Sequence, residues 1–199
     1  DAAISNPLYK ETDFTFTGQA SITGTDAGTY PMELKPEDFT NTNKNFANVT
    51  FVIVDGQLKI NQKALTITAD SAAKEYDGTA LTKDSYTSTD LAEGDAFASV
   101  TVTGTITEVG TEDNVPSAAV IKDGEEDVTA NYEITYKNGK LEVTKSSKIV
   151  AIASADATWT YDGQDHSNPE YVVTYGEANV AKNENGTFTL PTGDKITIT

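Results

Sequence analysis

The sequence predicts an all-β protein made of tandem, small β-sandwich modules of immunoglobulin-like type, each about 83 residues long. Three observations support this prediction: the chain repeats itself, threonine is abundant (31 of 199 residues), and no amphipathic helical run of ten or more residues occurs. Periodicity does not determine strand order, so β-grasp-like α+β modules remain the alternative.

Two patterns of this sequence occur twice. A strand-like run followed by Tyr-Asp-Gly occupies residues 64–78 and again 149–163, and residues 131–143 echo residues 48–60. A fixed period indicates one folding unit used repeatedly. We therefore predict three segments: a partial, divergent unit at 1–61 (the first segment), a complete unit at 62–145 (the middle segment), and a partial unit at 146–199 (the third segment) that carries the first part of the pattern.

In the first segment, alternating apolar residues flank Asp55 and Gly56. Asp-Gly is a common two-residue hairpin turn, so we expect a β-hairpin here. Residues 36–39 begin with proline, which favours a single helical turn.

The middle segment starts with an alternating strand at residues 65–68, followed by a turn at Tyr76, Asp77 and Gly78. Residues 99–109 alternate again and contain Gly104, which suggests a bulge or a close backbone approach. Residues 113–127 are polar, and we expect them to be irregular apart from a short apolar run at 118–121.

The last part of the middle segment gives the clearest hairpin prediction. Tyr132, Ile134 and Tyr136 alternate before Asn138 and Gly139, and apolar residues alternate again afterwards. Asn-Gly favours the type I′ turn, whose twist matches that of paired strands. In the third segment the Tyr-Asp-Gly turn recurs at Tyr161, Asp162 and Gly163.

Composition excludes several classes of function. The formal net charge is −17 and the chain contains no arginine, so binding to nucleic acid or to an anionic membrane is disfavoured. No apolar stretch approaches the roughly 18 residues of a membrane span. Without cysteine, and with His166 as the one histidine, neither a zinc site nor a Ser-His-Asp arrangement is indicated, so we expect no enzyme activity and no cofactor.

Two weaker candidate sites remain. Aromatic residues of the third segment are candidates for stacking on a sugar, although packing of the tryptophan in a core is the ordinary expectation; they are Trp159, Tyr161, Tyr171 and Tyr175. Acidic residues near the polar stretch of the middle segment are candidate calcium ligands, although their spacing matches no known loop; they are Asp113, Asp123, Glu125, Glu126 and Asp127.

The runs LTITADSAAKEYDGTALT, VTVTGTITEVGT and NYEITYKNGKLEVT resemble the repeats called MBG or YDG domains. The resemblance is firmest over residues 63–145, and the first segment lacks a Tyr-Asp-Gly motif. It implies a secreted, wall-attached bacterial protein in which such domains occur in tandem, as in large adhesin-like surface proteins.

We therefore expect a non-catalytic stalk or spacer whose partners are neighbouring repeat domains of the same polypeptide. The alternative is a module that binds host glycan or protein directly through exposed aromatic residues of the third segment. Clustered, solvent-facing aromatic side chains in the third segment would favour binding, whereas buried ones would favour the spacer.

Overall fold

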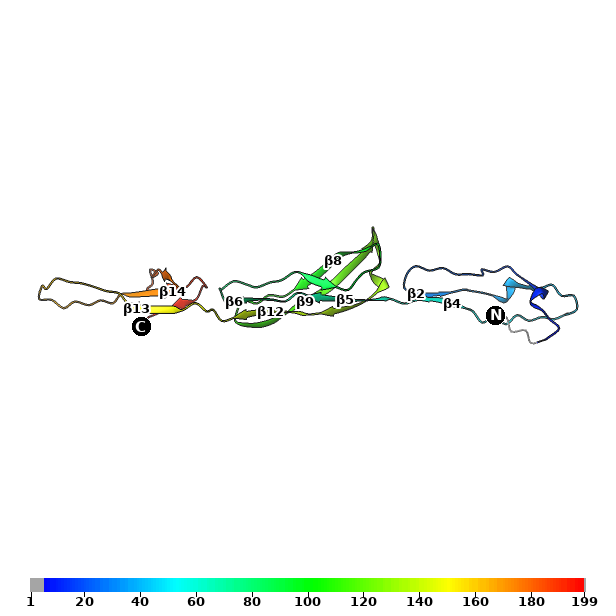
Figure 1. The fold of residues 1–199 in the computed structure, drawn as a ribbon, viewed down its shortest axis with the longest axis horizontal. Helices are drawn as coiled ribbons and strands as arrows, with labels where there is room; N and C mark the ends of the chain where they lie inside the picture. The colour runs from blue at the N-terminus through cyan, green and yellow to red at the C-terminus, as the bar shows by residue number, and fades with distance from the viewer. Residues whose placement is uncertain (1–5, 199) are drawn as a thin grey trace. The chain divides into compact units, whose positions relative to one another are not determined.

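A computed structural model describes residues 6–198 of the chain and confirms an all-β fold (Figure 1). The described residues form 17 strands in six sheets, three 3₁₀-helices and no α-helix, which is consistent with β-sandwich modules and gives the α+β alternative no support. Within this described part, no helix has the length and apolar character needed to cross a bilayer.

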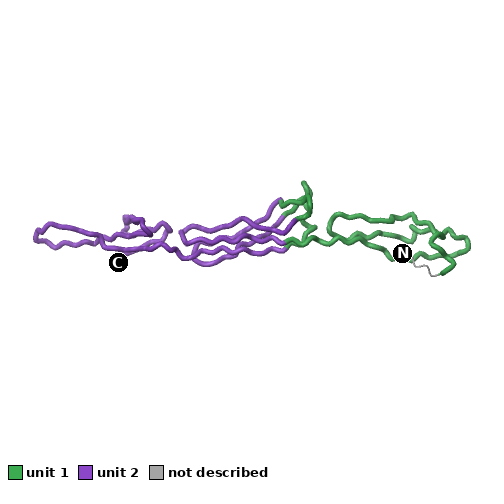
Figure 2. The backbone as a smooth tube through the Cα atoms, in the orientation of Figure 1, with its two compact units in different colours: residues 1–65, 91–97, 120–134 green, residues 66–90, 98–119, 135–199 purple. Residues whose placement is uncertain are grey.

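The chain divides into two compact units, which Figure 2 colours separately. One unit comprises residues 1–65, 91–97 and 120–134, and the other comprises residues 66–90, 98–119 and 135–199. The limits of the three predicted sequence segments therefore remain a prediction.

The first segment contains short antiparallel strand pairs. Strands β1 (Phe14–Phe16) and β3 (Phe39–Asn41) pair, as do β2 (Gly28–Pro31) and β4 (Gln57–Ile60). The 3₁₀-helices η1 (Glu11–Asp13) and η2 (Pro36–Asp38) precede β1 and β3, and η2 begins with proline as predicted. Aromatic side chains pack together beside the first strand pair: Phe14, Phe16, Phe39 and Phe51.

The hairpin predicted around Asp55 and Gly56 does not form. Residues 51–56 contain no strand, and β4 pairs with β2 instead. The Asp55 carboxylate accepts hydrogen bonds from the backbone N–H groups of Glu33 (2.9 Å) and Leu34 (3.1 Å). This aspartate therefore contacts a distant part of the segment rather than closing a local turn.

A buried tyrosine network lies in the compact unit that includes residues 91–97 and 120–134. Strand β10 (Glu126–Asp127) pairs with the end of β9 (Gly110–Asp123), and η3 (Thr129–Asn131) follows. Tyr132 is buried, and its hydroxyl donates to the Asp95 carboxylate and accepts from the N–H of Ala92. Burial, and then the Asp95 hydrogen bond, raise the pKa of Tyr132.

The middle segment is divided between two sheets. Strands β11 (Tyr132–Lys137), β5 (Lys63–Ala69) and β7 (Tyr86–Ser88) form one, and the other has the order β10-β9-β12-β6, with β8 (Asp95–Thr103) also paired to β9. Strand β12 (Gly139–Thr144) is antiparallel to β9 and parallel to β6 (Ala72–Glu75). Apolar side chains are buried from both sheets: Leu65, Ile67 and Ala69 from β5, Ala119 and Ile121 from β9, and Leu141 and Val143 from β12.

The hairpin predicted at Asn138 and Gly139 is wrong, because β11 and β12 belong to different sheets. Gly139 is not among the residues with positive φ, as a type I′ turn would require. A Cβ atom there would instead overlap the backbone carbonyls of Ala69 and Asp70. The glycine therefore permits a close backbone approach where the chain passes from one sheet to the other.

The irregular stretch predicted at residues 113–127 is instead largely strand, within the 14-residue strand β9. Its buried positions are Asn114 and Pro116 before Ala118, and Ala119 and Ile121 after it. Ala118 has a φ of +50°, which is the backbone distortion of a bulge. The bulge moves the buried face by one residue, and this shift hides the alternation in the sequence.

The third segment contains one three-stranded antiparallel sheet and one strand pair. Strands β13 (Val150–Ser154), β14 (Tyr171–Tyr175) and β15 (Ala178–Val180) form the sheet, and β16 (Phe188–Thr189) pairs with β17 (Lys195–Ile196). Val173 and Tyr175 are buried, whereas every residue of β13 is exposed.

Candidate functional site

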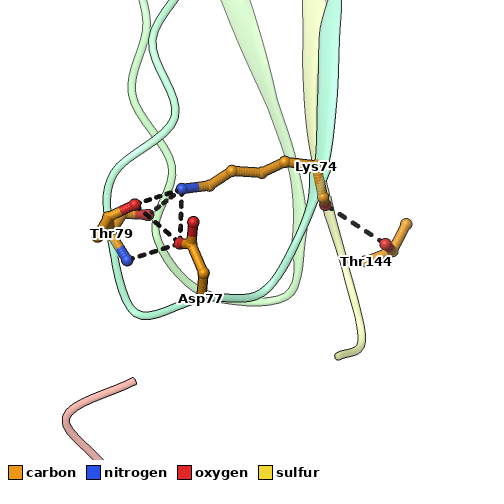
Figure 3. A network of polar contacts seen from close by, with 4 residues as sticks. All are labelled: Lys74, Asp77, Thr79 and Thr144. Atoms are coloured by element: carbon orange, nitrogen blue, oxygen red, sulfur yellow. Dashed lines mark hydrogen bonds and ion pairs between the residues drawn. The ribbon is translucent and has the colours of Figure 1, made fainter. Parts of the chain in front are cut away.

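The Tyr-Asp-Gly turn of the middle segment, defined here as residues 76–79, is closed by its own side chains (Figure 3). The Asp77 carboxylate accepts hydrogen bonds from the N–H (2.9 Å) and hydroxyl (2.8 Å) of Thr79. Lys74, at the end of β6, donates from Nζ to Asp77 (2.8 Å) and to the carbonyl oxygen of Thr79 (2.7 Å). Short contacts thus fix the turn to the strand that precedes it.

Strand β12 anchors the same end of β6. The N–H of Tyr76 donates to the carbonyl oxygen of Thr144 (2.8 Å), and the Thr144 hydroxyl donates to the Lys74 carbonyl oxygen (3.3 Å). Hydrogen bonds from Lys74 and then Thr79 hold the pKa of Asp77 well below its usual range. The carboxylate is therefore charged at neutral pH and acts as an acceptor only.

Gly78 brings this turn against a second tight turn at residues 190–194, named here the facing turn. Gly78 has a φ of +80°, and a Cβ atom on it would overlap the backbone of Thr192. The hydroxyl of half-buried Tyr76 lies 3.5 Å from the carboxylate of Asp194. The facing turn is closed by its own bonds, from the N–H of Gly193 to the Leu190 carbonyl (2.9 Å) and from the Leu190 N–H to the Asp194 carbonyl (2.8 Å).

A second set of contacts lies beside the two turns. The Glu75 carboxylate accepts from the hydroxyl (2.9 Å) and N–H (3.2 Å) of Ser147, and these bonds lower the pKa of Glu75. Ser146 Oγ lies 2.9 Å from the Tyr175 hydroxyl, and the Lys148 ammonium lies 5.2 Å from the centre of the Tyr175 ring. Glu75, Ser146, Lys148 and Tyr175 line a small cavity of about 140 Å³ together with residues of the two turns. It is too small for a drug-sized ligand, whose pockets typically reach about 300–1,000 Å³.

A further contact joins the first and middle segments at the other end of the middle segment. Asn131 accepts from the N–H of Ala27 (2.7 Å) and donates to the Asp26 carboxylate (2.8 Å). Gln62 donates to the carbonyl oxygens of Ala130 (2.9 Å) and Tyr132 (3.3 Å). Side-chain amides therefore connect the 3₁₀ turn η3 to residues on both sides of the predicted boundary.

The matching turn of the third segment has the same shape and fewer contacts. Asp162 accepts from the N–H of Gln164 (2.9 Å), and Gly163 has a φ of +79°. No heavy atom lies within 4 Å of a Cβ built on Gly163, and Tyr161 is 93% exposed. Tyr161 therefore does not pack against a core.

The candidate aromatic residues of the third segment are not gathered into one site. Trp159 is 48% exposed and lies outside any strand. The expectation that this tryptophan packs in a core is therefore wrong. It stacks on His166, with ring centres 5.0 Å apart, and His166 Nε2 lies 3.0 Å from Asp162. Tyr171 is exposed on β14, whereas Tyr175 is buried.

The candidate calcium ligands are dispersed along β9 and the turn after it. Asp113 and Asp123 are ten residues apart on one strand, which corresponds to about 33 Å. Asp113 accepts from the amide of Asn138 (2.9 Å), and Asp127 accepts from the N–H of Thr129 (2.9 Å). Among the described residues, no group of three or more potential ligands is placed to hold a metal.

Sequence reasoning missed several residues that make these contacts: Asp26, Glu75, Asn131, Ser147 and Asp194. Each is a common polar residue in a loop or at an element end, and only its spatial neighbour distinguishes it. The donors and acceptors of the Tyr-Asp-Gly turn are already bonded to one another. The arrangement is suited to holding two stretches of chain together, and it presents no activated nucleophile.

Comparison with protein families identifies residues 65–142 as a match to the model of the MBG domain (YGX type), which confirms the resemblance seen in the sequence. Domains of this family are typical of surface proteins. Comparisons with the curated proteins and with the solved structures give no match.

Proposed function

We propose that this chain, which contains an MBG domain at residues 65–142, is a non-catalytic spacer in the stalk of a bacterial cell-surface protein of adhesin-like type. One observation carries the proposal: side chains at both ends of the domain bond to the segments on either side of it. Such contacts limit bending between successive domains, which a spacer requires.

The charge of the chain supports the same role. A formal charge of −17 makes the surface self-repelling and well hydrated, which opposes collapse and aggregation on a crowded cell surface. In this role the partners are the neighbouring domains of the polypeptide, and the protein is secreted and attached to the cell wall.

Immunolabelling tests the location. An antibody raised against this chain should label intact cells of the source bacterium, and protease treatment of intact cells should remove the label. Labelling that appears only after cell lysis would contradict the proposal.

Direct binding of a host glycan or protein is the second candidate, because Trp159, Tyr161 and Tyr171 are exposed. Exposed aromatic rings stack on sugars through their apolar faces. A glycan array and a mucin-binding assay test it, with Trp159→Ala as the informative variant and Phe46→Ala, outside the third segment, as the control. Binding that Trp159→Ala alone abolishes would replace the spacer role with an adhesive one.

A further inference from the structure

We propose that the Tyr-Asp-Gly turn is a docking surface that couples one domain to the next, and that its partner is the facing turn at residues 190–194. This inference rests on the proposed spacer role and assigns a task to the motif that recurs in the sequence. Both turns lie in the same compact unit.

The first step is that the turn keeps its shape without its partner. The contacts that close it come from Lys74, Asp77 and Thr79, all within the middle segment. The turn at Asp162 and Gly163 has the same carboxylate-to-backbone bond and nearly the same glycine φ, although nothing packs against its glycine. A surface formed before docking loses little conformational entropy when it docks.

The second step is that Gly78 meets two separate requirements. Its φ of +80° is a conformation that other residues rarely adopt, and its missing Cβ lets Thr192 approach. Gly163 meets only the first requirement. Both glycines therefore have a positive φ that would strain any substitution, but only Gly78 makes the docking contact.

The third step is that polar contacts hold the two turns in one orientation. Tyr76 reaches Asp194 from one turn to the other, and Glu75 holds Ser147 at the start of the third segment. Both acceptors are carboxylates. Glu75 accepts two bonds, at 2.9 and 3.2 Å, whereas the single contact of Tyr76 with Asp194 is longer at 3.5 Å, so Glu75 is the stronger of these two attachments.

The matched pair of glycines provides the experiment. The chain has no cysteine, so spin labels can be placed at Thr101→Cys on β8 and Asn179→Cys on β15, both exposed strand positions. Pulsed electron resonance on the full chain then measures the distribution of distances between the labels. We expect Gly78→Ala to broaden this distribution and shift its maximum, and Gly163→Ala to leave both unchanged.

A second pair of variants keeps the test decisive if Gly78→Ala does not fold. Glu75→Ala removes the bonds to Ser147 without backbone strain, and Glu112→Ala removes an exposed carboxylate from β9 in the same sheet. Broadening with Glu75→Ala alone supports the docking surface. Equal distributions in the parent, Gly78→Ala and Glu75→Ala would overturn it, whatever immunolabelling shows about location.

Discussion

At the scale of single residues, the most informative side chain is Asn114, which is fully buried in β9. Its amide nitrogen donates to the carbonyl oxygens of Asp70 (2.9 Å) and Lys83 (2.7 Å). Its own oxygen has no hydrogen-bond partner and lies where Gly104 leaves room for it. One amide thus satisfies two carbonyls, that of Asp70 between β5 and β6 and that of Lys83 between β6 and β7.

Replacing this asparagine should destabilise the protein. Asn114→Ala removes both hydrogen bonds, and each lost intramolecular hydrogen bond costs about 0.5–1.5 kcal/mol. The control is Asn138→Ala, which removes an exposed hydrogen bond to Asp113 and should change stability little. Urea denaturation followed by circular dichroism compares them, and similar midpoints for the two variants would contradict this account of Asn114.

Gly139 gives a second prediction at this scale. Its φ is not positive, so only the missing side chain is important, and Gly139→Ala should destabilise by driving Cβ into the backbone near Asp70. Gly28→Ala is the matched control, because a Cβ there would meet only ordinary contacts with Tyr30 at 3.7 Å or more. Thermal melts should show a clear loss for Gly139→Ala and little change for Gly28→Ala.

At the scale of elements, the strands that supply the core differ in how deeply they are buried. Leu141 on β12 is completely buried, whereas Ile134 on β11 is half-buried and Tyr136 is exposed. Leu141→Ala should therefore cost about 2–5 kcal/mol, as large-to-small core substitutions do. Ile134→Ala should cost less, and a urea midpoint as low as that of Leu141→Ala would contradict the burial described here.

The end of β6 gives a dependence on pH. The pKa of Asp77 is lowered from 3.8 by its bonds to Lys74 and Thr79, so its stabilising effect is complete above that value. The effect is lost as pH falls below about 3.8 toward the lower pKa of the folded protein. Melting temperatures measured from pH 6 to pH 2 should fall more steeply for the parent than for Asp77→Asn. Parallel curves for the two proteins would show that the carboxylate bonds do not stabilise the fold.

The all-β class, the turns at residues 76–79 and η2 could be predicted from the sequence, because alternation, Asp-Gly and proline act locally. The pairing of β12 could not, since Leu141 and Val143 alternate identically whether the partner is β11 or β9. Ala118 concealed β9 by shifting its buried face. The docking contacts were also beyond the sequence, because Tyr76 and Asp194 are 118 residues apart.

At the scale of the whole molecule, the parallel pairing of β6 and β12 determines how the domain bears tension. In the proposed spacer role the domain is pulled through its two ends, backward along β5 and the β6 strand that follows it, and forward along β12. Because the strands are parallel, this pull slides one along the other, and the pairs from Ala72–Leu141 to Glu75–Thr144 share the load simultaneously. If the two strands were instead peeled apart from one end, the same bonds would break one at a time. In the proposed spacer role, the rate of unfolding under force is the relevant measure of stability, and we expect shear along these two strands to keep that rate low.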